Sequence, residues 1–204
     1  MIPAPIVLIP GTWGLDDLWW RDESEVSAML RAETGAPVAP FKWTGNLGGV
    51  LDFSPSDPAD PWTAGGLREW AIEAQHLIDF CWHTWPDVPV SVLAHSHGGN
   101  LAALAVAYGL KVRHLVTLAT PPRSDMAAIY GRATSLLEGE WLHLYGDWWR
   151  DWIIKLGQLG DGRIGWTRQI PEADRQIHVP GAGHSDIIAP EHLLVTGVVG
   201  LLRS

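Results

Sequence analysis

Residues 90–100 read Val90-Ser91-Val92-Leu93-Ala94-His95-Ser96-His97-Gly98-Gly99-Asn100, and this stretch decides the fold class. An apolar run ends at Ser96, and small residues followed by a run rich in Ala, Leu and Val come directly after it. This order predicts a buried strand, a tight turn and a helix, which is the layout of a nucleophile elbow. In that turn the serine hydroxyl stands above the sheet edge, and the free N–H groups at the helix N-terminus point at the same place.

The predicted turn departs at one position from the usual G-x-S-x-G pattern. Ala94 stands where the first glycine is usual, whereas Gly98 holds the second. Both positions must be small because the strand and helix backbones nearly touch at the turn. Alanine has the smallest side chain after glycine, so the turn is still predicted at Ser96.

Length and composition favour a single compact domain over residues 1–204. Hydrophobic residues make up 47% of the chain and charged residues only 18%, which argues against disorder. The net charge of −9 argues against a nucleic-acid-binding surface, which is normally basic. No apolar run approaches the roughly 18 residues of a transmembrane helix. The first residues, Met1–Pro5, lack the charged leader of a secretory signal, so the sequence predicts a cytoplasmic protein.

Strand and helix patterns alternate along the chain. Strands are expected at Pro5–Pro10, Val38–Trp43, Val88–Ala94, Val112–Ala119, Glu140–Tyr145 and Arg175–Val179, and helices at Asp22–Thr34, Leu67–Trp85, His97–Tyr108 and Glu191–Leu202. Several strand segments are continuous apolar runs, which is typical of a parallel sheet covered on both faces. We therefore predict an α/β fold, a doubly wound and mostly parallel sheet of about six strands with helices on both faces.

Two irregular segments interrupt this alternation. Thr44–Gly66 is rich in Gly, Pro, Asp and Ser, and Arg123–Gly139 is long enough for about one helix. The short second segment leaves little room for an inserted cap domain over the predicted turn, and neither segment resembles a linker between domains. The sequence leaves open whether residues 44–66 form a flap.

A serine hydroxyl needs a base before it can act as a nucleophile, and that base should lie on a loop at the same sheet edge. His184 is the best-placed candidate. It follows the last predicted strand in Val179-Pro180-Gly181-Ala182-Gly183-His184, where small residues allow the loop to turn back. His95 and His97 alternate with Ser96, so we expect them to point elsewhere and to make structural hydrogen bonds.

The acid that would orient the imidazole should follow the predicted strand Glu140–Tyr145. Asp147 comes immediately after that strand, whereas Asp151 is followed two places later by an apolar residue. The sequence favours Asp151 but does not settle the choice, and the other carboxylate is expected to pair with Arg150. Asp125, after the preceding strand, is a more distant alternative.

An attacked carbonyl would also need preset N–H donors for the oxyanion that forms. The backbone N–H of His97, at the head of the predicted helix, is one candidate. The other is Thr12, in the loop Pro10-Gly11-Thr12-Trp13-Gly14 after the first strand, whose hydroxyl could donate as well.

Tryptophan is unusually frequent, with 13 residues in 204. One interpretation is a core and a surface that are rich in large rings. The other notes that Trp13, Trp148 and Trp149, with neighbours at positions 19, 20 and 152, follow strands at the predicted serine edge. Aromatic walls there would suit an apolar acyl group, so Trp13, Trp148 and Trp149 are candidate substrate-binding residues.

These motifs together resemble the α/β-hydrolases, in particular the small bacterial and phage serine esterase or lipase-like group. The resemblance runs from residue 5 to about residue 190 and is carried by Ile9–Trp13, by Phe41–Asn46 (similar to F-x-W-[ST]-G-N), by Ala94–Asn100, by Val116–Pro122 and by Gly183–Ser185. The departures are Ala94 and the spacing of the acid. The first two strands of the family are also expected to be missing.

The resemblance implies hydrolysis of a carboxylic ester through an acyl-enzyme, without a metal or organic cofactor. The expected partner is a small-molecule ester, and the limited cap predicts activity on soluble short-chain esters. A lipase or cell-envelope lipid esterase is an alternative, and so is a non-catalytic binding protein with the same fold. A metal site built from His184, Asp186 and His192 is disfavoured because their spacing fits no common ligand pattern. The oligomeric state is not indicated.

Overall fold

One parallel sheet organises the computed structural model, which describes residues 3–12, 18–45, 67–155, 164–165 and 167–204. Within those residues the strands are β1 (Ile6–Ile9), β2 (Val38–Pro40), β3 (Val90–His95), β4 (Val112–Leu118), β5 (Trp141–Tyr145) and β6 (Arg175–His178). Their order is β2-β1-β3-β4-β5-β6, and every neighbouring pair is parallel. The predicted fold class is therefore confirmed, and each expected strand is present within a few residues of its expected bounds.

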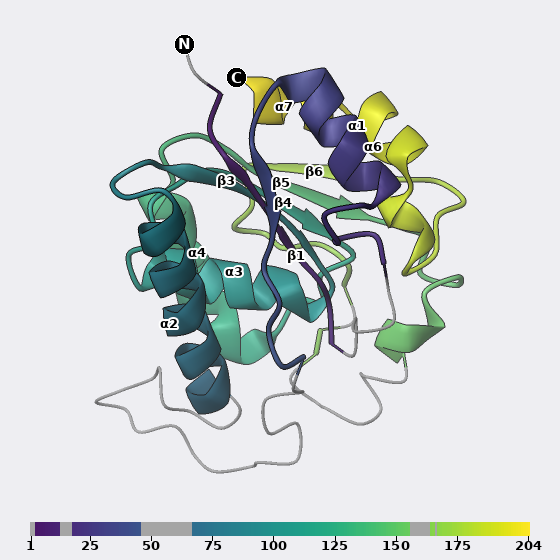
Figure 1. Ribbon diagram of the computed structural model, residues 1–204. Coiled ribbons are helices and arrows are strands. Elements are labelled where there is room, and N and C mark those ends of the chain that lie inside the picture. The colour runs from purple at the N-terminus through teal and green to yellow at the C-terminus, as the bar shows by residue number, and fades with distance from the viewer. Residues whose placement is uncertain (1–2, 13–17, 46–66, 156–163, 166) are drawn as a thin grey trace.

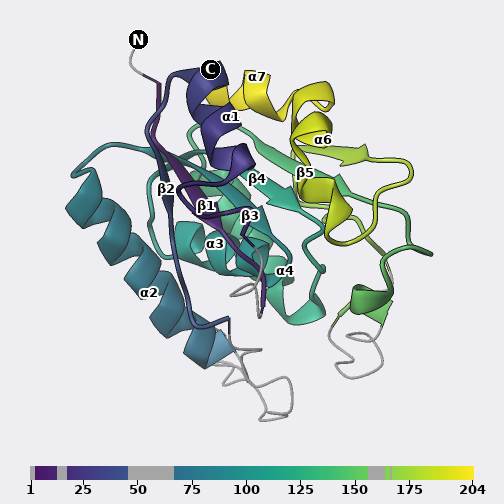
Figure 2. The same ribbon diagram turned by 45° about the vertical axis from the view of Figure 1, so that its right-hand side comes forward.

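Helices cover both faces of this sheet, as Figures 1 and 2 show. On one face lie α2 (Leu67–Thr84), α3 (His97–Ala107) and α4 (Ala127–Leu136), preceded by the short η2 (Ser124–Met126). On the other lie α1 (Glu25–Thr34), α6 (Pro190–Val195) and α7 (Val198–Arg203), and η3 (Asp186–Ile188) directly precedes α6. Because both faces are covered, β1 and β3 are buried along their whole length, which explains the unbroken apolar sequence of β1 and the mostly apolar sequence of β3.

Local sequence sets where the helices begin and end. Ser24 caps α1, because its hydroxyl accepts a hydrogen bond from the N–H of Ser27 at 3.0 Å, and Gly35 ends the helix with φ of 70°. The prediction of a single C-terminal helix over Glu191–Leu202 was wrong, because the structure has two short helices there. Gly197 adopts φ of 79°, a left-handed conformation that stops α6 and starts α7.

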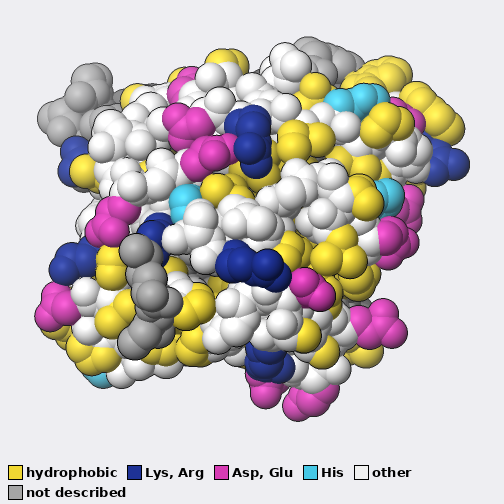
Figure 3. Space-filling model, turned by 90° about the horizontal axis from the view of Figure 1, so that it is seen from above, with side chains coloured by type: hydrophobic (Ala, Val, Ile, Leu, Met, Phe, Trp, Pro, Cys, Tyr) yellow, Lys and Arg dark blue, Asp and Glu magenta, His cyan; other side chains and the backbone are white. Residues whose placement is uncertain are grey.

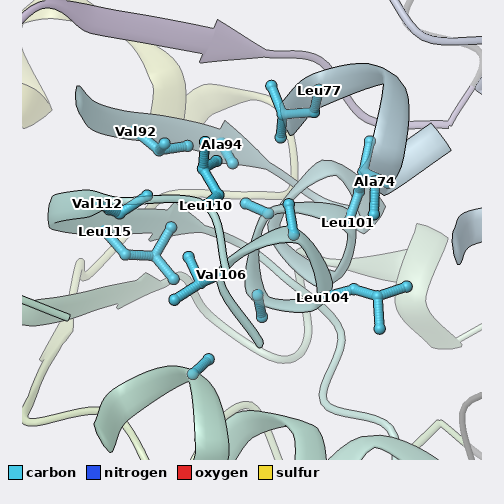
Figure 4. Packing of buried hydrophobic residues seen from close by; sticks show 14 of the residues in the cluster. Ala74, Leu77, Val92, Ala94, Leu101, Leu104, Val106, Leu110, Val112 and Leu115 are labelled. Atoms are coloured by element: carbon cyan, nitrogen blue, oxygen red, sulfur yellow. The ribbon is translucent and has the colours of Figure 1, made fainter. Parts of the chain in front are cut away.

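The core on the α3 face is built around a helix that is buried on all sides. Figure 4 shows Leu101 of α3 beside Ala74 of α2, and Val106 on the opposite side of the helix beside Leu115 of β4. Leu104 is buried as well. Burying a leucine side chain contributes roughly 1.5–3 kcal/mol, so this helix is a large part of the stability of the fold. The opposite face has its own cluster, in which Leu8 and Leu93 share an apolar layer with Leu30 of α1.

The surface above α1, α6 and α7 is mixed in character. Figure 3 shows hydrophobic side chains there between charged side chains of both signs, without a broad basic area. Leu194 and Val195 of α6 are among the exposed apolar residues. No helix in the described parts of the chain has the length and hydropathy that crossing a membrane requires.

We predict that Gly98→Ala destabilises the protein, whereas Gly131→Ala stabilises it. A Cβ atom at Gly98 would lie 2.3 Å from the carbonyl oxygen of Pro10, so β1 and α3 would have to separate. Overpacking of this kind costs about 1–3 kcal/mol. Gly131 lies inside α4 with nothing within 4 Å of an added Cβ, so alanine should raise the free energy of unfolding by about 0.5–1 kcal/mol. Urea unfolding followed by tryptophan fluorescence measures both, and equal effects of the two substitutions would contradict the prediction.

Candidate active site

Ser96 occupies the turn between β3 and α3 in a conformation that few residues other than glycine adopt. Its φ is 52° and its ψ is −134°, which costs on the order of 1–3 kcal/mol for a residue with a side chain. Hydrogen bonds hold it there: the Ser96 N–H donates to the Leu118 carbonyl at 2.8 Å, and the Gly99 N–H donates to the Ser96 carbonyl at 3.0 Å. The strained turn predicted from the sequence is present at Ser96.

Three glycines let neighbouring segments approach this turn. A Cβ at Gly11 would lie 2.7 Å from the Cβ of Ser96, and one at Gly99 would lie 2.0 Å from the hydroxyl oxygen of Thr120. Gly98 meets the Pro10 carbonyl in the same way. The loop after β1 therefore runs directly against Ser96, which only a residue without a side chain allows.

The structure brings three polar side chains from separate loops together at the carboxyl edge of the sheet. The Ser96 hydroxyl lies 3.0 Å from Nε2 of His184, and Nδ1 of His184 lies 3.2 Å from Oδ2 of Asp151. All three side chains are buried, with Ser96 and His184 each 7% exposed and Asp151 2% exposed. Because a carboxylate only accepts, Nδ1–H donates to Asp151 and Nε2 is left to accept from the serine hydroxyl.

Asp151 is held by groups on both carboxylate oxygens. The N–H of Ile154 donates to Oδ1 at 3.1 Å, which caps the helical turn over 152–155. The guanidinium of Arg168 lies 3.6 Å from Oδ2. Burial raises the pKa of Asp151, but the hydrogen bond and charge of His184, the Ile154 N–H and Arg168 outweigh it, so the pKa lies below its ordinary value. The carboxylate is therefore ionised at neutral pH.

Asp147, the other candidate acid, does not reach His184. Its Oδ1 lies 2.8 Å from Nε2 of His178, and its Oδ2 accepts from the N–H of Gly181 at 2.9 Å. The expected direct pairing with Arg150 is replaced by these two contacts, while Arg150 itself donates to the Gly181 carbonyl. The Gly181 N–H bond is the largest cause that lowers the pKa of Asp147. Asp147 thus ties the loop after β5 to the loop that carries His184.

The two histidines that flank Ser96 make structural contacts. His95 donates from Nε2 to the carbonyl oxygen of His184 at 2.8 Å, and the two rings lie 4.8 Å apart. Nδ1 of His97 lies 3.2 Å from Nδ2 of Asn100, and its ring packs against Trp70. Burial lowers the pKa of both to about 3, so both rings are neutral.

The candidate oxyanion donors lie where the loop after β1 meets the head of α3. His97 is the first residue of α3, directly after Ser96, so its N–H lies among those at the helix start that lack an intrahelical acceptor. Thr12 follows Gly11, and its hydroxyl is buried without a hydrogen-bond partner in the described structure. Buried polar atoms are normally satisfied, so an unpartnered hydroxyl here indicates room for a ligand atom.

The tryptophans proposed as substrate contacts lie in different surroundings. Trp13 lies outside the described residues. Trp148 and Trp149 are 47% and 65% exposed, with Lys155 3.8 Å above the first ring and Arg150 5.0 Å above the second. They lie on the loop that carries Asp151 and face solvent.

Arg168 and His143 were missed by the sequence analysis. Arg168 lies in an irregular stretch with no recognisable motif, so no signal marked it. His143 could have been noticed, because it is a polar residue in the apolar strand Trp141–Tyr145. It is fully buried and forms hydrogen bonds through both ring nitrogens.

Asp125, the more distant alternative for the acid, pairs with Arg123 at 2.7 Å, away from His184. Among the described residues, no three His, Cys, Asp or Glu side chains are grouped as metal ligands would be.

Such a chain of hydroxyl, imidazole and carboxylate can perform nucleophilic chemistry. The imidazole can accept the serine proton as the oxygen attacks an electrophile, and the carboxylate stabilises the imidazolium that forms. The adjacent helix N-terminus is suited to stabilise developing negative charge.

Comparisons with known proteins agree with the fold. No protein family model and no curated protein sequence matches the chain. Among solved structures it is similar to a predicted CIB-like hydrolase from Thermoplasma acidophilum (14% identity, TM-score 0.58, covering 98% of this chain and 86% of that one). A structure from a study of carboxylesterases of Nitrososphaera gargenis matches at 12% identity and TM-score 0.60, covering 98% and 91%. The Pyrococcus furiosus esterase Pf2001 matches at 12% identity and TM-score 0.56, covering 99% and 81%. The chain therefore has the α/β-hydrolase fold.

Proposed function

We propose that this protein is a single-domain serine hydrolase that cleaves carboxylic esters through an acyl-enzyme. The observation that carries the proposal is the continuous chain from the Ser96 hydroxyl through His184 to Asp151, with separations of 3.0 Å and 3.2 Å. The similar solved structures include carboxylesterases, and this supports an ester as the substrate.

In the first half of the reaction, Ser96 attacks the ester carbonyl while Nε2 of His184 takes the hydroxyl proton. The oxyanion accepts hydrogen bonds from the N–H groups of Thr12 and His97, and the free Thr12 hydroxyl adds a donor. His184 then gives its proton to the leaving alkoxide, so that an alcohol departs and the acyl group stays on Ser96.

In the second half, water takes the place of the alcohol. His184 accepts a proton from the water as it attacks the acyl carbonyl, and the same donors hold the oxyanion. The carboxylic acid leaves and Ser96 regains its proton. Asp151 remains ionised throughout and keeps the imidazole in the tautomer that both halves need.

A non-catalytic binding protein with this fold is less well supported. Binding alone would not need a buried, ionised carboxylate behind a buried imidazole, because such groups are costly to desolvate. The strained Ser96 backbone and the unpartnered Thr12 hydroxyl likewise favour catalysis.

We predict that Asp151→Asn lowers kcat for a nitrophenyl ester by on the order of 10⁴-fold, because the amide would hold His184 in the wrong tautomer. Asp147→Asn is the matched control. It makes the same chemical change four residues away, at a carboxylate bonded to Gly181 and His178. It should keep most of the activity and lower the thermal midpoint.

Ser96→Ala sets the background rate for both variants. Equal loss of activity in Asp147→Asn and Asp151→Asn would contradict the assignment of the acid. Hydrolysis that survives Ser96→Ala would contradict the proposed nucleophile.

A lipid esterase is the second candidate, and the exposed indoles on the Asp151 loop favour it. Trp149 and Trp152 are 65% and 62% exposed, Arg150 lies over the Trp149 ring, and Lys155 lies over the ring of the neighbouring Trp148. Indole rings with neighbouring cations are typical of surfaces that contact the interface of an anionic membrane.

For the short-chain esterase, nitrophenyl acetate and butyrate should be hydrolysed faster than the palmitate ester, and anionic phospholipid vesicles should leave the rates unchanged. The lipid esterase requires the reverse, a rate that rises with chain length or on addition of vesicles. Trp149→Ser in parallel separates the two, because it should slow only a reaction that needs the lipid surface.

A further inference from the structure

The guanidinium of Arg168 lies beside the carboxylate that faces His184, and its polar contacts within the described residues all go to Asp151. Nη1 lies 3.6 Å from Oδ2, the oxygen that also faces His184, and Nη2 donates to the Asp151 carbonyl at 3.4 Å. The Arg168 side chain is 7% exposed. Arginine and histidine thus share one carboxylate oxygen in a buried place, where charge acts strongly.

We propose that Arg168 is a positioning residue that sets the pH range of the reaction through Asp151. The inference rests on the proposed function, because it assigns a role within the same chain of groups. Arg168 offsets part of the carboxylate charge that stabilises the protonated imidazole, and it keeps Asp151 ionised.

A stabilising role in the fold alone explains Arg168 poorly. Nε and Nη1 are buried and make no hydrogen bond to any described residue. A guanidinium retained for structure would normally satisfy most of its five donors, because unpaired buried donors are costly. What remains is its proximity to the Asp151 carboxylate.

A hydrogen-bonded relay from the sheet interior holds the Arg168 backbone in place. Trp141 donates from Nε1 to the Thr117 hydroxyl at 2.9 Å, and that hydroxyl lies 2.8 Å from Nδ1 of His143. Nε2 of His143 in turn donates to the Arg168 carbonyl at 2.8 Å. Burial lowers the pKa of His143 to about 4, so the ring is neutral and its direction of donation is fixed.

The other ionisable groups around His184 are paired or neutral. His95 and His97 are neutral rings, and Asp147 is bonded to His178 and Gly181. Asp186 accepts from the Gly183 N–H at 3.0 Å, and Arg150 donates to the Gly181 carbonyl. Among the groups that the structure describes around His184, Arg168 is therefore the arginine that acts on Asp151 from within the buried site.

The sign of the pH effect follows from the charge. Loss of the Arg168 cation makes Asp151 easier to protonate and makes the protonated imidazole of His184 more stable. As the pH falls, protonation of either group inactivates the site, and without the cation this happens at a higher pH than in the wild type. The acidic midpoint of the kcat/KM profile should therefore rise when the charge is removed.

The test measures kcat/KM against pH for a soluble nitrophenyl ester with Arg168→Met, Arg168→Gln and Arg168→Lys. The Met and Gln variants should raise the acidic midpoint by about one pH unit, the scale on which a neighbouring charge acts on a carboxylate. KM should change little, because the described contacts of the Arg168 guanidinium go to Asp151 and not to Ser96 or to the candidate oxyanion donors. Arg168→Lys keeps the cation, so its acidic midpoint should return to that of the wild type. Two neutral variants are used so that the test can still be made if one of them fails to fold.

Arg175→Met is the control, because it removes an exposed arginine on β6 whose partner is Glu140. It should leave the midpoint unchanged. If the wild type is active and the acidic midpoint of the Met and Gln variants equals that of the wild type, this inference is overturned and the proposed function still stands. A wild type that hydrolyses no ester would overturn both.

Discussion

The close approach of β1 to the start of α3 is the constraint on which the rest of the structure depends. The added-atom distances at Gly11, Gly98 and Gly99, between 2.0 Å and 2.7 Å, show that no side chain fits between the loop after β1, the serine turn and the loop after β4. Because the strands are parallel, their carboxyl ends lie at one edge, and the turn delivers Ser96 there with strained backbone geometry. The buried packing of α3 against the sheet holds that strain in place.

The loops after β5 and β6 form a second unit that must be ordered for the site to exist. Asp147 and Gly146 hold the two loops in contact, since the Asp147 N–H donates to the Ala182 carbonyl at 2.9 Å and a Cβ at Gly146 would lie 2.2 Å from the same oxygen. His95 then fixes the His184 backbone from the sheet side. Asp147 therefore has a structural role, because it helps to place the two loops that carry Asp151 and His184.

The sheet and the Ser96–His184 pair could be predicted from the sequence, because unbroken apolar runs and chain order reflect local and topological rules. The choice between Asp147 and Asp151 could not. Both lie in one short loop, and the outcome depends on Asp151 capping the turn over 152–155 while Asp147 folds back to Gly181. The break at Gly197 was missed because a lone glycine in a helical pattern is a weak signal. The role of Arg168 could not be predicted, because it depends on a contact with Asp151 in another loop.

The measurement that tests this account most directly is covalent labelling with a fluorophosphonate, followed by peptide mass spectrometry. The account predicts one adduct per chain, on Ser96, with none in Ser96→Ala and much slower labelling in His184→Ala, because only a serine activated by its neighbouring imidazole reacts rapidly. A folded wild-type protein that acquires no adduct, or that acquires it on another residue, would contradict the claim that Ser96, His184 and Asp151 act as one unit.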